Sequence, residues 1–209
     1  QTGRPGPVVI DVPKDMTAPS EKFAYEYPEE VFIRSYQPSL KGHSGQIKKA
    51  IEALLAAQRP VVYAGGGVIW SNAHEELTDL AHRLNLPVTN TLMGLGTFPG
   101  SDRQFLGMLG MHGTYEANMS MHHADVILAV GARFDDRVTN NVKKFCPNAT
   151  IIHIDIDPAS ISKTILAHIP IVGDVKSVLT DMLEIVGQDK QLEQHALLDW
   201  WSQINERRK

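Results

Sequence analysis

The chain has 209 residues, of which 43% are hydrophobic and 21% charged, and its formal net charge is −4 with histidine neutral. This mix is typical of a soluble globular domain with one substantial core, and neither a basic surface nor an apolar run of ~18 residues points to nucleic acid or a membrane as partner. The single cysteine, Cys146, allows no internal disulfide, which favours a reducing, cytoplasmic location.

The first 43 residues show no sustained periodicity. The apolar run PVVIDVP at 7–13 predicts a short strand that ends at a proline. Residues 14–42 mix prolines with charges, which indicates a connecting segment with little regular structure.

From Ser44 onward, helical patterns alternate with short apolar runs. We expect a first helix that Ser44 caps and that stops at Pro60, and a second one with Asn72 and Glu75 as its capping box. Further helices are expected at 115–124, 175–186 and 191–207. Strands are expected at 61–64, 87–91, 125–131, 149–156 and 169–173. Residues 93–114 are rich in glycine and methionine without a clear period, which predicts a long functional loop.

These strands are apolar on both faces, and helices separate them. Such a pattern favours an α/β fold, a doubly wound parallel sheet with helices on both faces, and we expect it from about residue 44 to residue 186. In a sheet of this kind, ligands bind beyond the carboxyl ends of the strands.

The residues that follow the strands suit a nucleotide. Three glycines at 65–67 allow close approach of a phosphate, although a tight turn explains them equally well. In GARFDDR at 131–137, Arg133 or Arg137 can bind phosphate or carboxylate, or the arginines and aspartates can satisfy one another. We assign Asp155 to the ligand and Asp157, ahead of a proline, to a helix N-cap.

Other candidate groups carry less weight. His112, His122 and His123 have no cysteine or carboxylate at ligand spacing, so no metal site is predicted. Cys146 has no histidine partner in sequence that would make it a nucleophile. Trp200 and Trp201 are expected to cover a neighbouring domain rather than bind a small molecule.

Five motifs in this order resemble the catalytic subunit of the acetohydroxyacid synthase (acetolactate synthase) family, over essentially the whole chain. They are RPGPV at 4–8 with DVPKD at 11–15, AGGG at 64–67, TLMG at 91–94, LGMHG at 109–113 and GARFDDR at 131–137. The resemblance implies a bacterial enzyme of three domains, in which the first and third hold thiamine diphosphate between two subunits and the middle one, Rossmann-like, binds FAD.

The domain boundaries implied by the resemblance are 1–15 for the end of the pyrimidine-binding domain, 16–43 for a linker, 44–187 for the FAD-binding domain and 188–209 for a helical linker. The FAD contacts carried over position by position are Arg4, Gly65, Gly66, Gly67, Thr91, Leu92, Met93, Leu109, Gly110, Met111, His112, Gly131, Ala132, Arg133, Asp135, Arg137, Val138, Asp155, Ile156, Ser160, Gly173, Asp174 and Val175. Met111, Asp136 and Arg137 are carried over to the substrate channel. Asp155 stands where the family often has glutamate.

The thiamine diphosphate motif, Gly-Asp-Gly followed by Asn-Asn, is absent: Gly173 and Asp174 continue with Val175. We therefore expect no catalytic residue and no thiamine diphosphate or Mg²⁺ site here, and a chain that is inactive by itself. The resemblance implies a transferase that joins two pyruvates, or pyruvate and 2-oxobutyrate, with loss of CO2 in branched-chain amino acid biosynthesis.

The implied partners are 2-oxo acids, a second catalytic subunit and a small regulatory subunit. Two alternatives stay open from the sequence. One is a related thiamine enzyme such as glyoxylate carboligase or pyruvate oxidase, and the other is a non-catalytic oligomerisation scaffold.

Overall fold

The centre of the molecule is a sheet of six parallel strands. The structure, a computed structural model, describes residues 3–20, 22, 24–30, 32–34, 36–187 and 194–208, the last range without the side chains of 194–196. The strands are β1 (Pro60–Ala64), β2 (Val88–Asn90), β3 (Phe105–Met108), β4 (Val126–Val130), β5 (Thr150–Asp155) and β6 (Ile169–Val172). Their spatial order is β3-β2-β1-β4-β5-β6, so the chain reverses its direction of growth between β1 and β4. That reversal is the topological switch point of a doubly wound sheet.

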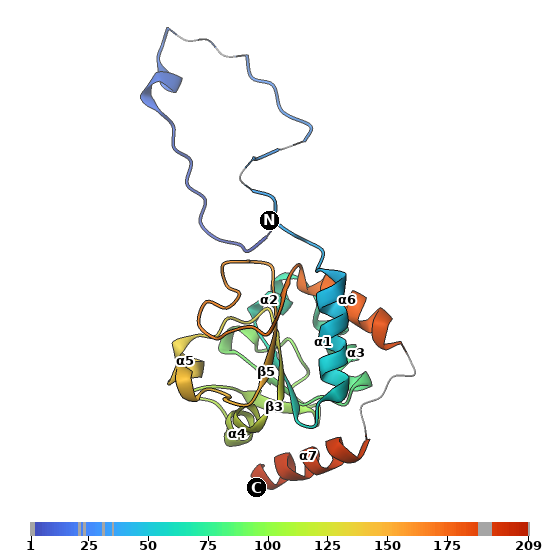
Figure 1. The fold of residues 1–209 in the computed structure, drawn as a ribbon. Helices are drawn as coiled ribbons and strands as arrows, with labels where there is room; N and C mark the ends of the chain where they lie inside the picture. Colours follow the sequence, from blue (N-terminus) through green and yellow to red (C-terminus); the bar gives the residue numbers. More distant parts are fainter. Residues whose placement is uncertain are drawn as a thin grey trace.

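Helices cover both faces of the sheet, as the sequence predicted (Figure 1). On one side, α1 (Ser44–Ala56) and α3 (His74–Arg83) both pack against α6 (Val175–Val186), and the other side carries α4 (Tyr115–His123) and the short α5 (Asp136–Thr139) with η3 (Val142–Lys144). β1 and β4 are buried along their whole length, because helices lie on both of their faces.

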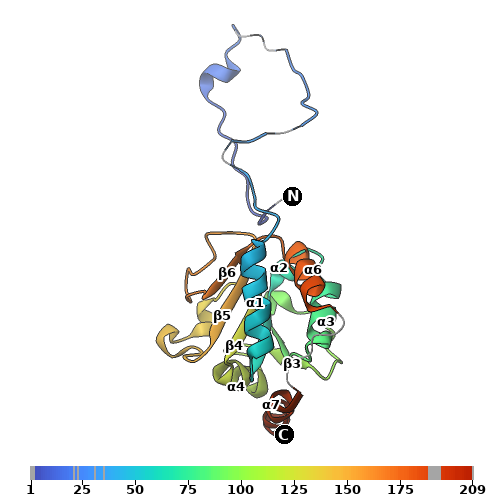
Figure 2. The same cartoon turned by 45° about the vertical axis from the view of Figure 1, so that its right-hand side comes forward.

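The predicted strand at 7–13 is wrong. These residues form no strand, and Val8, Val9 and Ile10 are exposed, Val9 by 90%. Their apolar, β-branched character is typical of a strand, but a strand also needs a neighbour to complete its hydrogen bonds. In Figures 1 and 2 the segment up to α1 runs out from the body of the domain, and its only regular element among the described residues is η1 (Lys14–Thr17).

The predicted second helix is split in two. A five-residue helix, α2 (Gly66–Trp70), ends before Asn72, which has a left-handed φ of 52°, and Ala73 is the N-cap of α3. The capping box of Asn72 and Glu75 is therefore wrong, because Asn72 ends the first turn instead of starting the second helix. In the same way, the residue before the first helix, His43, is the N-cap of α1 instead of Ser44.

The long loop predicted at 93–114 contains regular structure. Besides the end of η2 (Leu92–Gly94), it holds β3, whose glycine Gly107 has a φ of 86°. The glycines and methionines of this edge strand hid it, since they lack the β-branched pattern of the inner strands.

The last helix, α7 (Gln194–Arg207), packs against the edge where the strands begin. Trp200 is fully buried and donates from its indole nitrogen to the Pro60 carbonyl at 3.1 Å, and Trp201 donates to the Asn85 carbonyl at 3.1 Å. Both tryptophans thus pack on this domain, and the fully buried Trp200 leaves no surface for a neighbouring one. Residues 191–193 of the predicted helix lie outside the described part. No helix in the described part has the length and apolar character to cross a bilayer.

Candidate functional site

A cavity of about 680 Å³ lies beyond the carboxyl ends of β1, β2, β4, β5 and β6. Most of the predicted FAD contacts line it, namely Arg4, Gly66, Gly67, Thr91, Leu92, Met93, Gly131, Ala132, Arg133, Asp135, Arg137, Val138, Asp155, Ile156, Asp174 and Val175. The fold brings them together because the carboxyl ends of parallel strands meet at one edge of the sheet. The volume lies within the range of sites for small molecules and cofactors.

The other predicted contacts lie outside the cavity wall: Gly65, Leu109, Gly110, Met111, His112, Ser160 and Gly173. The loop around Met111 still approaches the cavity, since the backbone N–H of Met111 donates to the carbonyl of Arg137 at 3.0 Å. Of the residues predicted for the substrate channel, Arg137 lines the cavity, whereas Met111 and Asp136 are exposed outside it.

The glycines after β1 are explained in part by backbone packing. A Cβ on Gly67 would lie 2.6 Å from the Cα of Gly131, and a Cβ on Gly65 would collide with the Gly131 carbonyl. Gly131 itself has a φ of +55°, which L side chains rarely adopt. The turns after β1 and β4 therefore touch at the switch point. Gly66 lines the cavity as well, and a Cβ there would meet Met93 first, at 3.3 Å.

The arginines and aspartates after β4 partly pair with one another. Arg133 forms an ion pair with Asp135 at 2.7 Å, although two thirds of the Arg133 side chain stays exposed. Arg137 and Asp136 are 3.9 Å apart and both largely exposed. Surface pairs of this kind are weak, so both guanidinium groups remain available to an anion.

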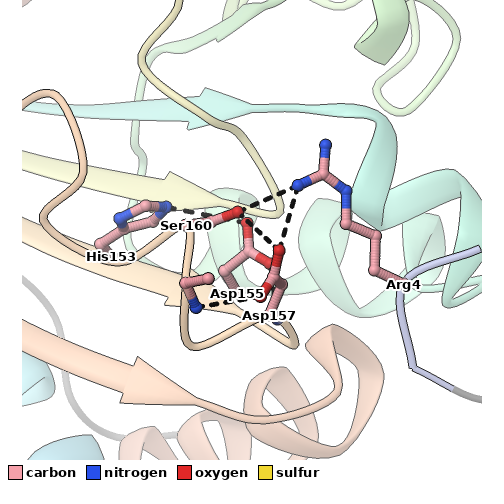
Figure 3. A network of polar contacts seen from close by, with 6 residues as sticks. Arg4, His153, Asp155, Asp157 and Ser160 are labelled. Atoms are coloured by element: carbon pink, nitrogen blue, oxygen red, sulfur yellow. Dashed lines mark hydrogen bonds and ion pairs between the residues drawn. The ribbon is translucent and has the colours of Figure 1, made fainter.

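Arg4 joins the N-terminal segment to the loop after β5 (Figure 3). Its guanidinium donates to Asp157 and to the Ser160 hydroxyl, both at 3.1 Å. Asp157 also accepts the Ala159 N–H at 2.9 Å, so it caps a turn and not the predicted helix. Partial burial opposes ionisation of Asp157, but the hydrogen bonds from Ala159, Arg4 and Ser160 outweigh it and lower its pKa.

Asp174 is held on both carboxylate oxygens. One oxygen accepts the Ser177 N–H at the start of α6, and the other accepts the Ser71 hydroxyl at 2.7 Å. Asp174 thus fixes Ser71 against α6 at the cavity wall, and Ser71 also accepts the Lys176 N–H at 2.8 Å.

Several cavity residues were missed by the sequence analysis: Gly3, Pro5, Leu40, Tyr63, Trp70 and Ser71. Tyr63 is the most informative, because its hydroxyl is buried and has no hydrogen-bond partner in the described part of the chain. Burial raises the pKa of Tyr63, so the hydroxyl keeps its proton and can donate. The Thr91 hydroxyl is also buried without a partner among the described residues. Trp70 adds an exposed apolar rim beside Leu92 and Met93.

Asp155 lines the cavity at the end of β5, with 14% of its side chain exposed. Its Oδ1 accepts the Asp157 N–H at 2.9 Å, and its Oδ2 lies 3.9 Å from Nε2 of the fully buried His153. Burial raises the pKa of Asp155 and lowers that of His153.

No cluster of three or more histidine, cysteine, aspartate or glutamate side chains suited to a metal ion occurs among the described residues. Cys146 is buried, and burial raises its pKa to about 12, so its thiol keeps its proton at neutral pH and is a poor nucleophile.

Comparison with known proteins identifies a domain family. The family model "Thiamine pyrophosphate enzyme, central domain" matches residues 47–182. The acetolactate synthase large subunit of Buchnera aphidicola subsp. Schizaphis graminum is 60% identical over 100% of this chain and 36% of that protein. The isozyme 3 large subunit of Escherichia coli K12 is 59% identical over 98% of the chain and 36% of its own length. A probable acetolactate synthase large subunit of Methanocaldococcus jannaschii is 52% identical over 87% of the chain and 31% of its own length. The chain thus spans about a third of the length of these relatives.

Proposed function

Because the chain belongs to the family of thiamine pyrophosphate enzyme central domains, we propose that it is the FAD-holding central domain of an acetolactate synthase large subunit. The single observation that carries the FAD assignment is the cavity at the switch point, whose wall gathers most of the residues that the resemblance assigns to FAD. The similarity to acetolactate synthase large subunits across the whole chain supports the enzyme assignment.

The cavity wall fits the chemistry of a flavin dinucleotide. It offers the Tyr63 and Thr91 hydroxyls, which have no partner among the described residues, for the polar edges of a ligand. It also offers an apolar rim at Trp70, Leu92 and Met93 for a flat aromatic ring. Arg133 and Arg137 are suited to a diphosphate, and Asp155 is suited to hydroxyl or amine donors. When bound, FAD does no net redox work in the family's main reaction.

The experiment is a titration of the purified chain with FAD, followed by flavin fluorescence and by thermal shift. Saturable binding that Arg133→Ala weakens is the expected result, since loss of one charge-assisted contact costs ~1.5–3 kcal/mol, about tenfold or more in Kd. Arg59→Ala is the matched control, because Arg59 is exposed beside the start of β1, at the opposite edge of the sheet. No saturable binding would overturn the proposal.

The activity that we propose for the whole protein is the joining of two 2-oxo acids with loss of CO2. Thiamine diphosphate does not fit this chain, because Asp174, the aspartate of the incomplete motif, already accepts hydrogen bonds on both oxygens. We place the thiamine diphosphate and Mg²⁺ sites in the parts of the enzyme that the chain does not span. Joining the chain to the flanking domains of a relative should yield acetolactate from pyruvate, and a fusion that folds and binds FAD without this activity would contradict the assignment.

The proposed partners are a second catalytic subunit and a small regulatory subunit. The cytoplasmic location and the domain boundaries stay predictions.

A further inference from the structure

A row of side chains crosses the sheet beneath the cavity. Tyr63, Ala129 and His153 are register partners on β1, β4 and β5, so they point to the same face. Phe134 packs between the two outer members, with ring centroids 5.6 Å from Tyr63 and 5.3 Å from His153. The small Ala129 leaves room for this ring. The row therefore holds His153 in a buried setting against an aromatic ring.

The imidazole of His153 has no hydrogen-bond partner among the described residues. Its side chain is fully buried, and neither ring nitrogen is hydrogen-bonded within the described part of the chain. Buried polar atoms are nearly always paired, so an unpaired imidazole needs an explanation. Burial lowers the pKa of His153, which leaves the ring neutral at pH 7 with one N–H to donate.

The group that faces Nε2 of His153 is the Asp155 carboxylate (Figure 3), and we assign the N–H of the neutral ring to this nitrogen. Nε2 of His153 lies 3.9 Å from Oδ2 of Asp155, while the other oxygen is already fixed by the Asp157 N–H. Three further groups affect the pKa values of this pair: the Ala132 carbonyl that of His153, and Arg4 and Asp157 that of Asp155. A separation of 3.9 Å is longer than a hydrogen bond, and a shift of about 1 Å closes it.

We propose that His153 is a positioning residue for Asp155, whose carboxylate it orients to accept hydrogen bonds from the hydroxyl- or amine-bearing nucleoside end of the bound FAD. This inference rests on the proposed function. His153 itself does not line the cavity, so it acts through Asp155. Ligand binding draws the carboxylate and the imidazole together and gives the N–H its partner.

The proposal predicts a specific pH dependence. Donors on the ligand bind the ionised form of Asp155, whose pKa is raised by burial, so affinity is full above that pKa and is lost as pH falls through it. The His153 N–H favours the ionised carboxylate. Its removal therefore raises the pKa of Asp155 further and moves the loss of affinity to higher pH.

The test compares FAD affinity across the pH range 5 to 8 for the chain and three variants. His153→Phe keeps the ring against Phe134 but has no N–H, and His153→Gln restores a donor near the position of Nε2. We expect His153→Phe to bind about tenfold more weakly at acid pH, with its inflection at higher pH, because one hydrogen bond to a charged group is lost. His153→Gln should recover most of the affinity. His123→Phe, on the exposed part of α4, should leave the profile unchanged.

Three outcomes distinguish a failure of the positioning role of His153 from a failure of the proposed FAD site. A His153→Phe chain that melts like the parent and keeps its affinity and pH profile would overturn the positioning role and leave the FAD site standing. Failure of His153→Gln to recover affinity, with the fold intact by circular dichroism, would also overturn it. No FAD binding by the parent chain would overturn the proposed function and this inference with it.

Discussion

The two edges of the sheet differ in how their polar groups are used. At the amino edge, three side chains of α7 and the residue after it donate to backbone carbonyls: Trp200 to Pro60, Trp201 to Asn85, and Arg208 to Phe105 at 2.7 Å. Nη1 of Arg207, also on α7, is the exception, since it is buried without a partner among the described residues. At the carboxyl edge, Tyr63, Thr91 and His153 carry buried polar atoms without partners in the described part. Paired groups stabilise a fold, whereas unpaired ones are retained where a ligand completes them. We therefore expect substitutions at the amino edge to change stability and those at the carboxyl edge to change binding.

The largest effect should come from Trp200→Ala. This change removes a fully buried indole and its hydrogen bond, so the free energy of unfolding should fall by about 3–5 kcal/mol. Urea unfolding measures it, with Leu198→Ala as the control on the exposed side of the same helix. FAD affinity, measured well below the melting temperature, should stay within about twofold, a difference of less than 0.5 kcal/mol. A Trp200→Ala chain that loses FAD affinity at unchanged stability would contradict the assignment of the amino edge to stability and of the carboxyl edge to binding.

Tyr63→Phe should instead weaken FAD binding without destabilising the fold. The hydroxyl is buried without a partner in the described part, so its removal should raise the free energy of unfolding by about 1 kcal/mol while it weakens FAD binding. Denaturant melts and FAD titrations of the same preparation measure the two effects. A large destabilisation would mean that the hydroxyl is bonded within the chain after all.

Asp155→Asn tests the carboxyl edge through the pH dependence of stability. Because the folded-state pKa of Asp155 lies above its unfolded value, its contribution to stability is full below the unfolded pKa and is lost as pH rises through the folded pKa. The substitution should thus stabilise the ligand-free chain at pH 7 and make its stability less dependent on pH between 4 and 7. Thermal melts at several pH values check this. A loss of stability at pH 7 would contradict the assigned desolvation of the carboxylate.

The smallest change in stability should follow Arg4→Ala. Its ion pair with Asp157 is half exposed on the arginine side, and such pairs contribute ~0–1 kcal/mol. FAD affinity should nevertheless fall, since Arg4 lines the cavity. Arg34→Ala, exposed in the same N-terminal segment, serves as the control and should change neither quantity. Equal effects of the two substitutions on FAD affinity would exclude a role of Arg4 in the site.

The inner part of the fold could be predicted because local and tertiary signals agree there. Residues 175–186 have an apolar face with helical spacing and are preceded by the capping Asp174, and α6 has these bounds. The run at 7–13 was misread because an apolar pattern does not reveal whether a strand has a neighbour.

Within the site, glycines and charged residues at strand ends could be found from the sequence, and they gather at the cavity. Tyr63 could not, since within PVVYA it looks like one more buried apolar residue. Its hydroxyl has no partner among the described residues, and its contacts with Phe134 and the cavity arise only in the tertiary structure. His153 was hidden for the same reason, inside the strand TIIHID.

The closure of the amino edge by α7 also has a consequence for biosynthesis. The Trp200 indole reaches a carbonyl 140 residues earlier in the chain. At ~5–20 residues per second, a ribosome needs roughly 7–28 s to add that stretch. During this interval the amino end of β1 lacks the tryptophan that covers it in the finished domain. Nascent chains of this domain therefore expose that edge to chaperones until translation has passed α7.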